Sequence, residues 1–127
     1  MCLLDRVESW DADTIECSAT SHLAATNPLR ENDRLSGACV IEYAAQAAAV
    51  HGALCAGGKT EAGMLASVRE LEIHVARLDD LSAPLTVRAE KVASDERTKV
   101  YAFAVHAGGA ALARGRFSVV LRPGLSA

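Results

Sequence analysis

The hydrophobic and polar positions of the chain first mark out one long apolar segment. Residues 37–56 are nearly all apolar and rich in alanine, the best helix former. Ser36 precedes them as a candidate N-cap, and Gly57-Gly58 follows as a candidate left-handed C-cap. The pattern therefore predicts one helix over 37–56. Because this helix is apolar around most of its circumference, other structure should wrap it.

Alternation of apolar and polar residues predicts strands on both sides of this helix. A short strand covers 14–20, after a short apolar lead over residues 1–7. A long loop follows over 21–36, because Asn27-Pro28 disfavours a helix and the polar run 30–34 lacks apolar periodicity. After the helix, the alternation predicts four consecutive strands, over 65–78, 85–92, 100–106 and 110–121.

Glycines mark the turns between these strands. We expect a polar turn at 59–63, directly after the helix. Ala107-Gly108-Gly109 between the last two strands is a strong hairpin signal. Gly115, inside the last strand, predicts a bulge or a close backbone approach.

The order of these elements predicts an α+β fold. A run of strands after one helix implies an antiparallel sheet with the helix against one face. One curved sheet that wraps one apolar helix is the hotdog fold, and 127 residues are enough for one such domain over 1–127.

Charge and composition exclude several classes of partner. A net charge of -3, and aromatic residues at only 4%, give no electrostatic or stacking case for nucleic acid or an anionic membrane. No apolar run of membrane-spanning length is free of charges, so we expect no membrane span. The N-terminal segment carries charges within its first six residues and is no signal peptide, which favours a cytoplasmic location.

The four cysteines are widely separated and lack CxxC spacing; they are Cys2, Cys17, Cys39 and Cys55. We expect them to be reduced and mostly buried, rather than paired or bound to zinc. Spacing alone leaves open a metal site assembled from scattered histidines and cysteines, but no ligand cluster predicts one.

Polar side chains are few on the central helix, and one of them is acidic. Glu42 and Gln46 are an i, i+4 pair and share a face, whereas His51 projects from the opposite side. Tyr43 is expected to be a core or interface aromatic with a satisfied hydroxyl group. The spacing fits either a Glu42 solvated at a rim or a Glu42 placed for chemistry.

The segment Ser36–Gln46 (SGACVIEYAAQ) resembles the central-helix motif of bacterial 3-hydroxyacyl-(acyl-carrier-protein) dehydratases of hotdog fold. In that family a glycine precedes the catalytic acid by five residues and an Ala-Gln pair follows it, as Gly37 and Ala45-Gln46 do around Glu42. The opening Leu3-Leu4-Asp5-Arg6-Val7 is similar to the family's N-terminal segment. With Asn27-Pro28-Leu29-Arg30, the whole chain looks like the small dehydratases of aryl-polyene-type pathways.

The resemblance implies dehydration of a 3-hydroxyacyl chain on acyl carrier protein, in fatty-acid or polyene-type lipid synthesis. One group must remove the C2 proton and another must protonate the C3 hydroxyl group. A neutral imidazole suits the first task, and a carboxyl whose pKa is raised by burial suits the second. The resemblance names Glu42 as the acid. The family's His-Phe-Pro-Gly segment is missing, and His22 is the only histidine upstream of Glu42, so it is the candidate base.

Three further residues are candidates for substrate binding. Backbone N–H groups at the helix N-terminus, around Gly37 and Ala38, would bind the thioester oxygen, with Gly37 allowing a close approach. Gln46 would orient the Glu42 carboxyl or bind the departing water. Acid and base groups suffice for this reaction, so we expect no metal and no organic cofactor.

The expected assembly is a homodimer, because a lone hotdog exposes an edge strand. In the family, moreover, the histidine and the acid of one site come from different subunits. Two alternatives stay open. One is a hotdog thioesterase, which hydrolyses the thioester, and the other is a non-catalytic acyl-binding or dimer-partner subunit, consistent with the missing His-Phe-Pro segment.

Overall fold

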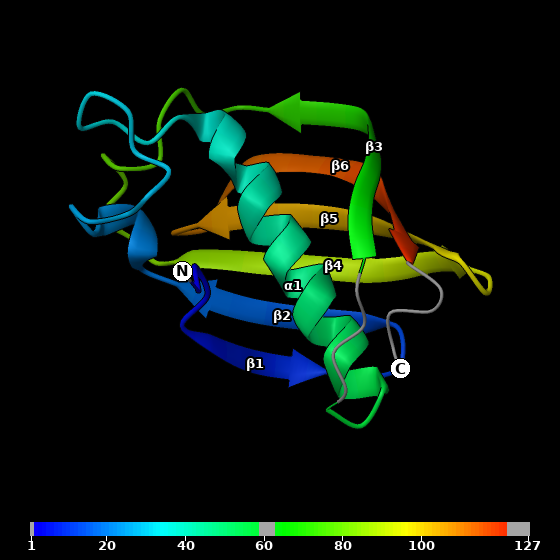
Figure 1. Cartoon of the computed structure of the whole chain (residues 1–127). Helices are drawn as coiled ribbons and strands as arrows, with labels where there is room; N and C mark the ends of the chain where they lie inside the picture. Colours follow the sequence, from blue (N-terminus) through cyan, green and yellow to red (C-terminus); the bar gives the residue numbers. More distant parts are fainter. Residues whose placement is uncertain (1, 59–62, 122–127) are drawn as a thin grey trace.

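A six-stranded antiparallel sheet with one helix across its face makes up the computed structural model, which describes residues 2–58 and 63–121 (Figure 1). The strands are β1 (Arg6–Trp10), β2 (Thr14–Ala19), β3 (Gly63–Ile73), β4 (Leu85–Ser94), β5 (Thr98–Ala107) and β6 (Ala110–Leu121). They lie in the order β1-β2-β4-β5-β6-β3. The helix is α1 (Val40–Cys55), and the 3-10 turns η1 (Ser21–Leu23) and η2 (Gly37–Cys39) precede it. The predicted α+β hotdog fold is confirmed.

The ends of the helix follow the predicted caps. The Ser36 side chain accepts a hydrogen bond from the N–H of Ala38 at 3.2 Å, and η2 leads directly into α1. At the other end, Gly57 and Gly58 have φ values of 73° and 92°, and the Gly58 N–H donates to the carbonyl of Ala53. Only glycine adopts such conformations without strain, so these residues stop the helix.

The core lies between α1 and the middle strands. Tyr43, Ala44 and Ala47 of the helix are fully buried, as are Ile15 of β2 and Val87 of β4. By length and by a mean hydropathy of 1.2, residues 37–55 also have the character of a membrane-crossing segment. The core helix of a soluble protein passes the same test, and here the apolar side chains of α1 pack against the sheet.

The edge strand β3 is long, bent and exposed along most of its length. Its exposed hydrophobic side chains are Met64, Leu65, Val68 and Leu71. The bend falls at Glu70, which has a φ of 53°, and the pairing with β6 shifts register between Arg69 and Glu72 (Figure 1). On β6, a Cβ added to Gly115 would lie 3.3 Å from the Cα of Leu71, so the predicted close backbone approach is confirmed.

The structure differs from the sequence-based elements in two places. The lead over residues 1–7 was not predicted to form a strand, but β1 begins at Arg6 and pairs with β2. Its residues are all exposed, so it has no buried face for a pattern to reveal. The strand predicted over 65–78 ends at Ile73, and Arg77 instead forms an ion pair with Asp79 in the following loop.

The remaining turns follow the prediction where they can be compared. Gly108 and Gly109 have φ values of 57° and 83° and join the paired residues Ala107 and Ala110, which confirms the hairpin. Most of the turn predicted at 59–63 lies outside the described residues.

Candidate active site

The first turn of α1 presents Glu42 to solvent between two residues that are not exposed. Ile41 is half-buried and Tyr43 fully buried, so the exposed carboxylate lies at a margin of the apolar helix. An acidic residue in the first turn is also favoured by the positive end of the helix dipole. The burial that the acid role was expected to require is therefore not found in this chain, and the Glu42 carboxylate is open to solvent.

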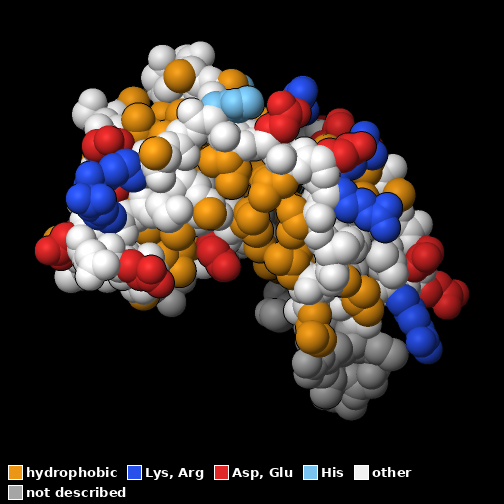
Figure 2. All heavy atoms as spheres, turned by 90° about the horizontal axis from the view of Figure 1, so that it is seen from above, with side chains coloured by type: hydrophobic (Ala, Val, Ile, Leu, Met, Phe, Trp, Pro, Cys, Tyr) orange, Lys and Arg blue, Asp and Glu red, His pale blue; other side chains and the backbone are white. Residues whose placement is uncertain are grey.

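A cavity of about 170 Å³ begins one helical turn beyond Glu42. Its helical wall consists of Ala45, Ala48, Ala49 and Gly52. Ala45 and Ala49 follow Glu42 by three and seven residues, so they share its helix face. Leu65 of β3, Tyr101 of β5 and Val119 of β6 line the opposite wall. Seen from above, apolar side chains gather in the central hollow of the molecule (Figure 2).

His22 lies in η1 with its imidazole fully buried. Nε2 is 3.0 Å from the carbonyl oxygens of both Leu81 and Ala83. Because carbonyl oxygens only accept hydrogen bonds, Nε2 carries the proton. In a neutral ring with this tautomer, Nδ1 is the nitrogen that carries the lone pair. This buried atom has no hydrogen-bond partner among the described residues.

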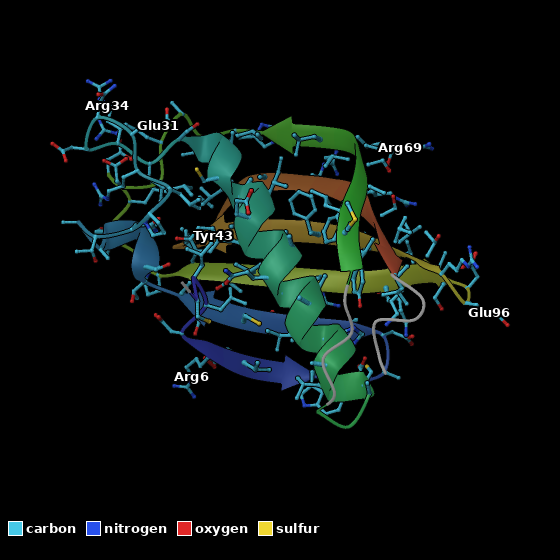
Figure 3. All side chains as sticks on the ribbon, viewed as in Figure 1. Arg6, Glu31, Arg34, Tyr43, Arg69 and Glu96 are labelled. Carbon is cyan, nitrogen blue, oxygen red and sulfur yellow. The ribbon has the colours of Figure 1, made fainter. Side chains whose placement is uncertain are left out.

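No hydrogen bond or ion pair joins His22 to Glu42 in the described part of the chain. Their chain neighbours, however, are in direct contact, since the Tyr43 hydroxyl group lies 2.8 Å from Oγ of Ser21. Figure 3 shows Tyr43 on the side of α1 that faces the loop containing η1. The two predicted catalytic residues are therefore held in one region without touching.

The Tyr43 hydroxyl group is part of a buried network. Ser21 Oγ donates to the carbonyl of Leu3 at 2.6 Å, so the Tyr43 hydroxyl donates to Ser21. Asn27 donates through Nδ2 to the carbonyl of Ser21 and to the Tyr43 oxygen, at 2.9 and 3.3 Å. Burial raises the pKa of Tyr43, which keeps the phenol protonated. Tyr43 is thus a core aromatic with a satisfied hydroxyl group, as expected.

The backbone donors at the start of the helix are already engaged within the chain. The N–H groups of Gly37, Ala38 and Cys39 donate to the Ala76 carbonyl, to the Ser36 hydroxyl and to the Ser36 carbonyl, respectively. A Cβ on Gly37 would lie 1.9 Å from the carbonyl oxygen of Val75, so the backbone that approaches this glycine closely is the protein's own. The sequence-based role of Gly37 and Ala38 as donors to a thioester oxygen would require these hydrogen bonds to be broken.

Gln46 is tied to the N-terminal segment. Its side-chain oxygen accepts a hydrogen bond from the N–H of Leu3 at 2.7 Å. Leu3 is itself buried, so this bond fixes the chain start against α1. The side-chain oxygen of Gln46 is therefore occupied away from the Glu42 carboxylate.

The loop before α1 is held by charged side chains that are largely buried. The Arg30 side chain is 15% exposed and donates to the carbonyls of His22, Ala24 and Asp33. The Arg30 side chain therefore holds this loop together through hydrogen bonds to its backbone. At the tip of this loop, Glu31 and Arg34 (labelled in Figure 3) are joined by backbone hydrogen bonds, each N–H donating to the carbonyl of the other residue.

Asp79 anchors the same loop from the β3–β4 connection. Its carboxylate pairs with Arg77 and accepts the N–H of Leu35 at 2.9 Å. The hydrogen bond from Arg77, followed by that from Leu35, holds the pKa of Asp79 well below its usual range.

His51 and Tyr101 form a second polar pair at the far end of α1. His51 is fully buried, with Nδ1 at 2.8 Å from the Tyr101 hydroxyl and Nε2 at 2.9 Å from the carbonyl of Asp11. As expected, it lies on the side of α1 opposite Glu42. Tyr101 lines the cavity, a role that sequence reasoning missed because strand residues give no sign of which helix face they meet.

The four cysteines are free, as expected. Burial raises the pKa of Cys17 to about 11, so its thiol stays protonated. Cys2 and Cys55 are exposed, however, so the expectation that most cysteines are buried was wrong. Within residues 2–58 and 63–121, no three histidine, cysteine, aspartate or glutamate side chains converge on a metal-sized site.

Comparison with known protein families assigns the chain to one of them. The profile of the ApeP-like family, described as ApeP dehydratase, matches residues 1–126. The chain belongs to the ApeP-like dehydratase family. No curated protein sequence matches it significantly.

Solved structures show what this ApeP-like dehydratase resembles in fold. The dehydratase heterocomplex ApeI:P from Xenorhabdus doucetiae superposes with a TM-score of 0.83 at 20% identity, covering 97% of this chain and 84% of that one. A putative thioesterase from Silicibacter sp. TM1040 superposes with a TM-score of 0.67 at 14% identity, covering 92% of this chain and 78% of that one. A mutant thioesterase from Pseudomonas aeruginosa superposes with a TM-score of 0.62 at 17% identity, covering 92% of this chain and 81% of that one.

Proposed function

We propose that this ApeP-like dehydratase removes water from 3-hydroxyacyl chains carried on acyl carrier protein and releases trans-2-enoyl thioesters. The observation that carries the proposal is the exposed carboxylate of Glu42, one helical turn from the start of an apolar cavity. The apolar packing of α1 does not require an acid at this position, although the positive end of the helix dipole favours one there. An acyl chain has both of the parts that the arrangement suits, a polar reacting end and an apolar tail.

Glu42 is proposed as the group that protonates the departing C3 hydroxyl group. Its carboxylate is open to solvent in the isolated chain, so bound substrate would have to displace the water around it before the proton transfer. The base takes the C2 proton, Glu42 gives its proton to the departing hydroxyl group, and one water molecule is released. The enzyme is restored when the base loses its proton to solvent and Glu42 takes one up.

His22 is proposed as the base. In its favour, the two carbonyls at Nε2 fix the tautomer and leave Nδ1 with a free lone pair. Its full burial adds a requirement, because the connection containing Leu81 and Ala83 must open before a substrate reaches Nδ1. Three further residues stay proposed as substrate contacts, Gly37, Ala38 and Gln46. Each can bind substrate only after its hydrogen bond within the chain is broken.

A second hotdog subunit is proposed as the partner, with a homodimer as the expected assembly. The edge strand β3 offers unpaired backbone groups and four exposed apolar side chains. A partner could also supply a donor for the thioester oxygen, because the N–H groups of Gly37, Ala38 and Cys39 are bound within the described part of this chain. The similar structure from Xenorhabdus doucetiae is a heterocomplex, so mass measurement of the purified protein should distinguish a pair of identical chains from a mixed pair.

A hotdog thioesterase is the second candidate, favoured by the two similar thioesterase structures. It would use Glu42 to activate water and would release a free thiol. We expect either activity to proceed without metal or organic cofactor, because acid and base groups suffice. We also keep the cytoplasmic location as a proposal, which cell fractionation would test.

The deciding experiment incubates the protein with 3-hydroxyacyl and 2-enoyl thioesters of acyl carrier protein and follows their masses. Loss of water from the first, and gain of water by the second, would establish the dehydratase. Release of free thiol would establish the thioesterase instead. Acyl binding with neither reaction, in both the single chain and its purified assembly, would identify a non-catalytic subunit.

A further inference from the structure

We propose that Arg30 is a positioning residue for His22, because its guanidinium group ties together the two segments that hold the His22 imidazole. This inference rests on the proposed function, since it takes His22 as the base. It adds a residue outside the reacting groups that sets where the base lies and which of its ring nitrogens carries the proton.

Two segments of the chain meet around the His22 side chain, beyond the start of α1 (Figure 1). The first is the loop before α1, which carries His22 itself, and the second is the β3–β4 connection. Nε2 of His22 donates to the carbonyl oxygens of Leu81 and Ala83 in this connection, both at 3.0 Å. The direction of the imidazole therefore depends on how firmly the loop is held against the connection.

Arg30 joins the same two segments. Its Nη2 donates to the carbonyl of His22 at 3.2 Å, and its Nε donates to that of Ala24 at 2.8 Å. Nη1 donates to the carbonyl of Asp33 at 3.0 Å and lies 3.9 Å from Oδ2 of Asp79 in the connection. One planar group therefore holds the backbone of His22 and also reaches the segment that binds its ring.

The charges in this contact are largely shielded from water. The side chains of Arg30 and Asp79 are 15% and 6% exposed, so salt screens their attraction less than it would at the surface. A buried cation is costly unless several partners satisfy it, and three carbonyls and a carboxylate do so here. Lysine would keep the charge, but its ammonium group is a compact point charge without the rigid fork. The arrangement is therefore specific to arginine.

Arg77 allows positioning to be separated from simple stabilisation of the loop. It pairs with the same Asp79 carboxylate, its Nε donating to Oδ1 at 3.0 Å. Within the described part of the chain, the hydrogen bonds of its side chain go to Asp79 and not to the segment around His22. A contact that only stabilises the fold would make Arg30 and Arg77 equivalent, whereas positioning requires that only Arg30 affects His22.

The test follows the ring nitrogens of isotopically labelled histidine by NMR in the purified assembly. Wild type should show neutral His22 as the Nε2–H tautomer. In Arg30→Met the His22 signals should move towards a mixture of the two tautomers. The kcat for 3-hydroxyacyl thioesters should fall by about tenfold to a hundredfold, with KM nearly unchanged. His51 is an internal reference, because its Nε2 also lies against a carbonyl, that of Asp11, at the far end of α1.

Arg77→Gln is the matched control, which should be less stable in urea but keep the wild-type His22 signals and kcat. Arg30→Lys retains the charge and the hydrocarbon stem, so it serves if Arg30→Met fails to fold, and it should show the same changes to a smaller extent. Wild-type His22 signals in a folded Arg30 variant, or equal changes in Arg77→Gln, would overturn the inference even if dehydration is established. Altered His22 signals in the Arg30 variants alone, without dehydration in wild type, would support the positioning while the proposed reaction fails.

Discussion

The Tyr43 hydroxyl group lies 2.8 Å from Oγ of Ser21, and each residue is the chain neighbour of a proposed catalytic residue. Tyr43 follows Glu42 on α1, and Ser21 precedes His22 in η1. Asn27 binds both partners, at the carbonyl of Ser21 and at the Tyr43 oxygen. One buried hydrogen-bond network therefore fixes the loop with the proposed base against the helix with the proposed acid.

Tyr43→Phe should weaken this connection. The substitution removes the hydroxyl group and leaves Oγ of Ser21 without its donor and the Asn27 amide with one acceptor fewer. Loss of such a buried partner lowers the free energy of unfolding by about 1–3 kcal/mol. Urea unfolding should show this loss, and kcat should fall because the loop is less well placed. Unchanged stability would mean that water replaces the hydroxyl group and that the network does not hold the loop.

Glu42→Gln should abolish turnover while the fold is kept. The side chain is exposed and the amide has nearly the same shape, so the free energy of unfolding should stay within about 0.5 kcal/mol of wild type. Loss of the proton donor should lower kcat by about 10²-fold or more. Glu31→Gln, on the loop before α1, is a control that should keep wild-type activity. Turnover of Glu42→Gln at the wild-type rate would show that the acid is elsewhere.

His22→Ala should lower kcat by a similar factor if His22 is the base. The imidazole is buried and bound to two carbonyls, so the variant should also lose stability, by about 1–3 kcal/mol. The double variant with Glu42→Gln separates the two effects. Groups that serve one transition state are non-additive, so the double variant should be scarcely slower than either single variant. Fully additive losses would assign His22 a structural role only.

The fold was accessible from sequence because its signals are local. Alanine content and the flanking cap residues define α1, and two glycines define the β5–β6 hairpin. Burial alternates along β2 and β4, so their periodicity was visible. β1 was missed because all five of its residues are exposed and only pairing with β2 defines it.

The site was accessible only in part, because sequence places residues along an element but not against other elements. Helical spacing separated Glu42 from His51, and the structure exposes the first and buries the second. The sequence pattern gave no sign that the N–H of Gly37 donates to the carbonyl of Ala76, 39 positions away. It also gave no sign that the Arg30 side chain donates to the carbonyls of Ala24 and His22. Such long-range contacts form only on folding, and they decide whether a donor is free for a substrate.

Gly37→Ala should be strongly destabilising, unlike Gly52→Ala. A Cβ at Gly52 would meet nothing nearer than the end of Lys99, at 3.7 Å, and a helix interior favours alanine over glycine. At Gly37 the new methyl group would lie 1.9 Å from the carbonyl oxygen of Val75, so the start of the helix must move away from the segment at Ala76. Overpacking of this kind lowers the free energy of unfolding by about 1–3 kcal/mol or more. Thermal melting of the two alanine variants should give shifts of opposite sign. A Gly37→Ala protein as stable as wild type would show that η2 is not held tightly against Val75.

Acid should release the loop that Asp79 anchors. The hydrogen bonds from Arg77 and Leu35 hold the pKa of Asp79 below the ordinary value of 3.8, so its stabilising effect is complete above about pH 4. That effect is lost as the pH falls through the lower folded pKa, because protonation of the carboxylate breaks its charged hydrogen bonds. Asp79→Asn should therefore lower the melting temperature at pH 7 and flatten the decline of stability below about pH 4.

The decline should not disappear, since backbone hydrogen bonds also lower the pKa values of Asp11 and Asp95. Melting curves across pH 2–7 would test this, with Asp80→Asn as the neighbouring control. Parallel curves for wild type and Asp79→Asn would show that this carboxylate does not set the acid limit.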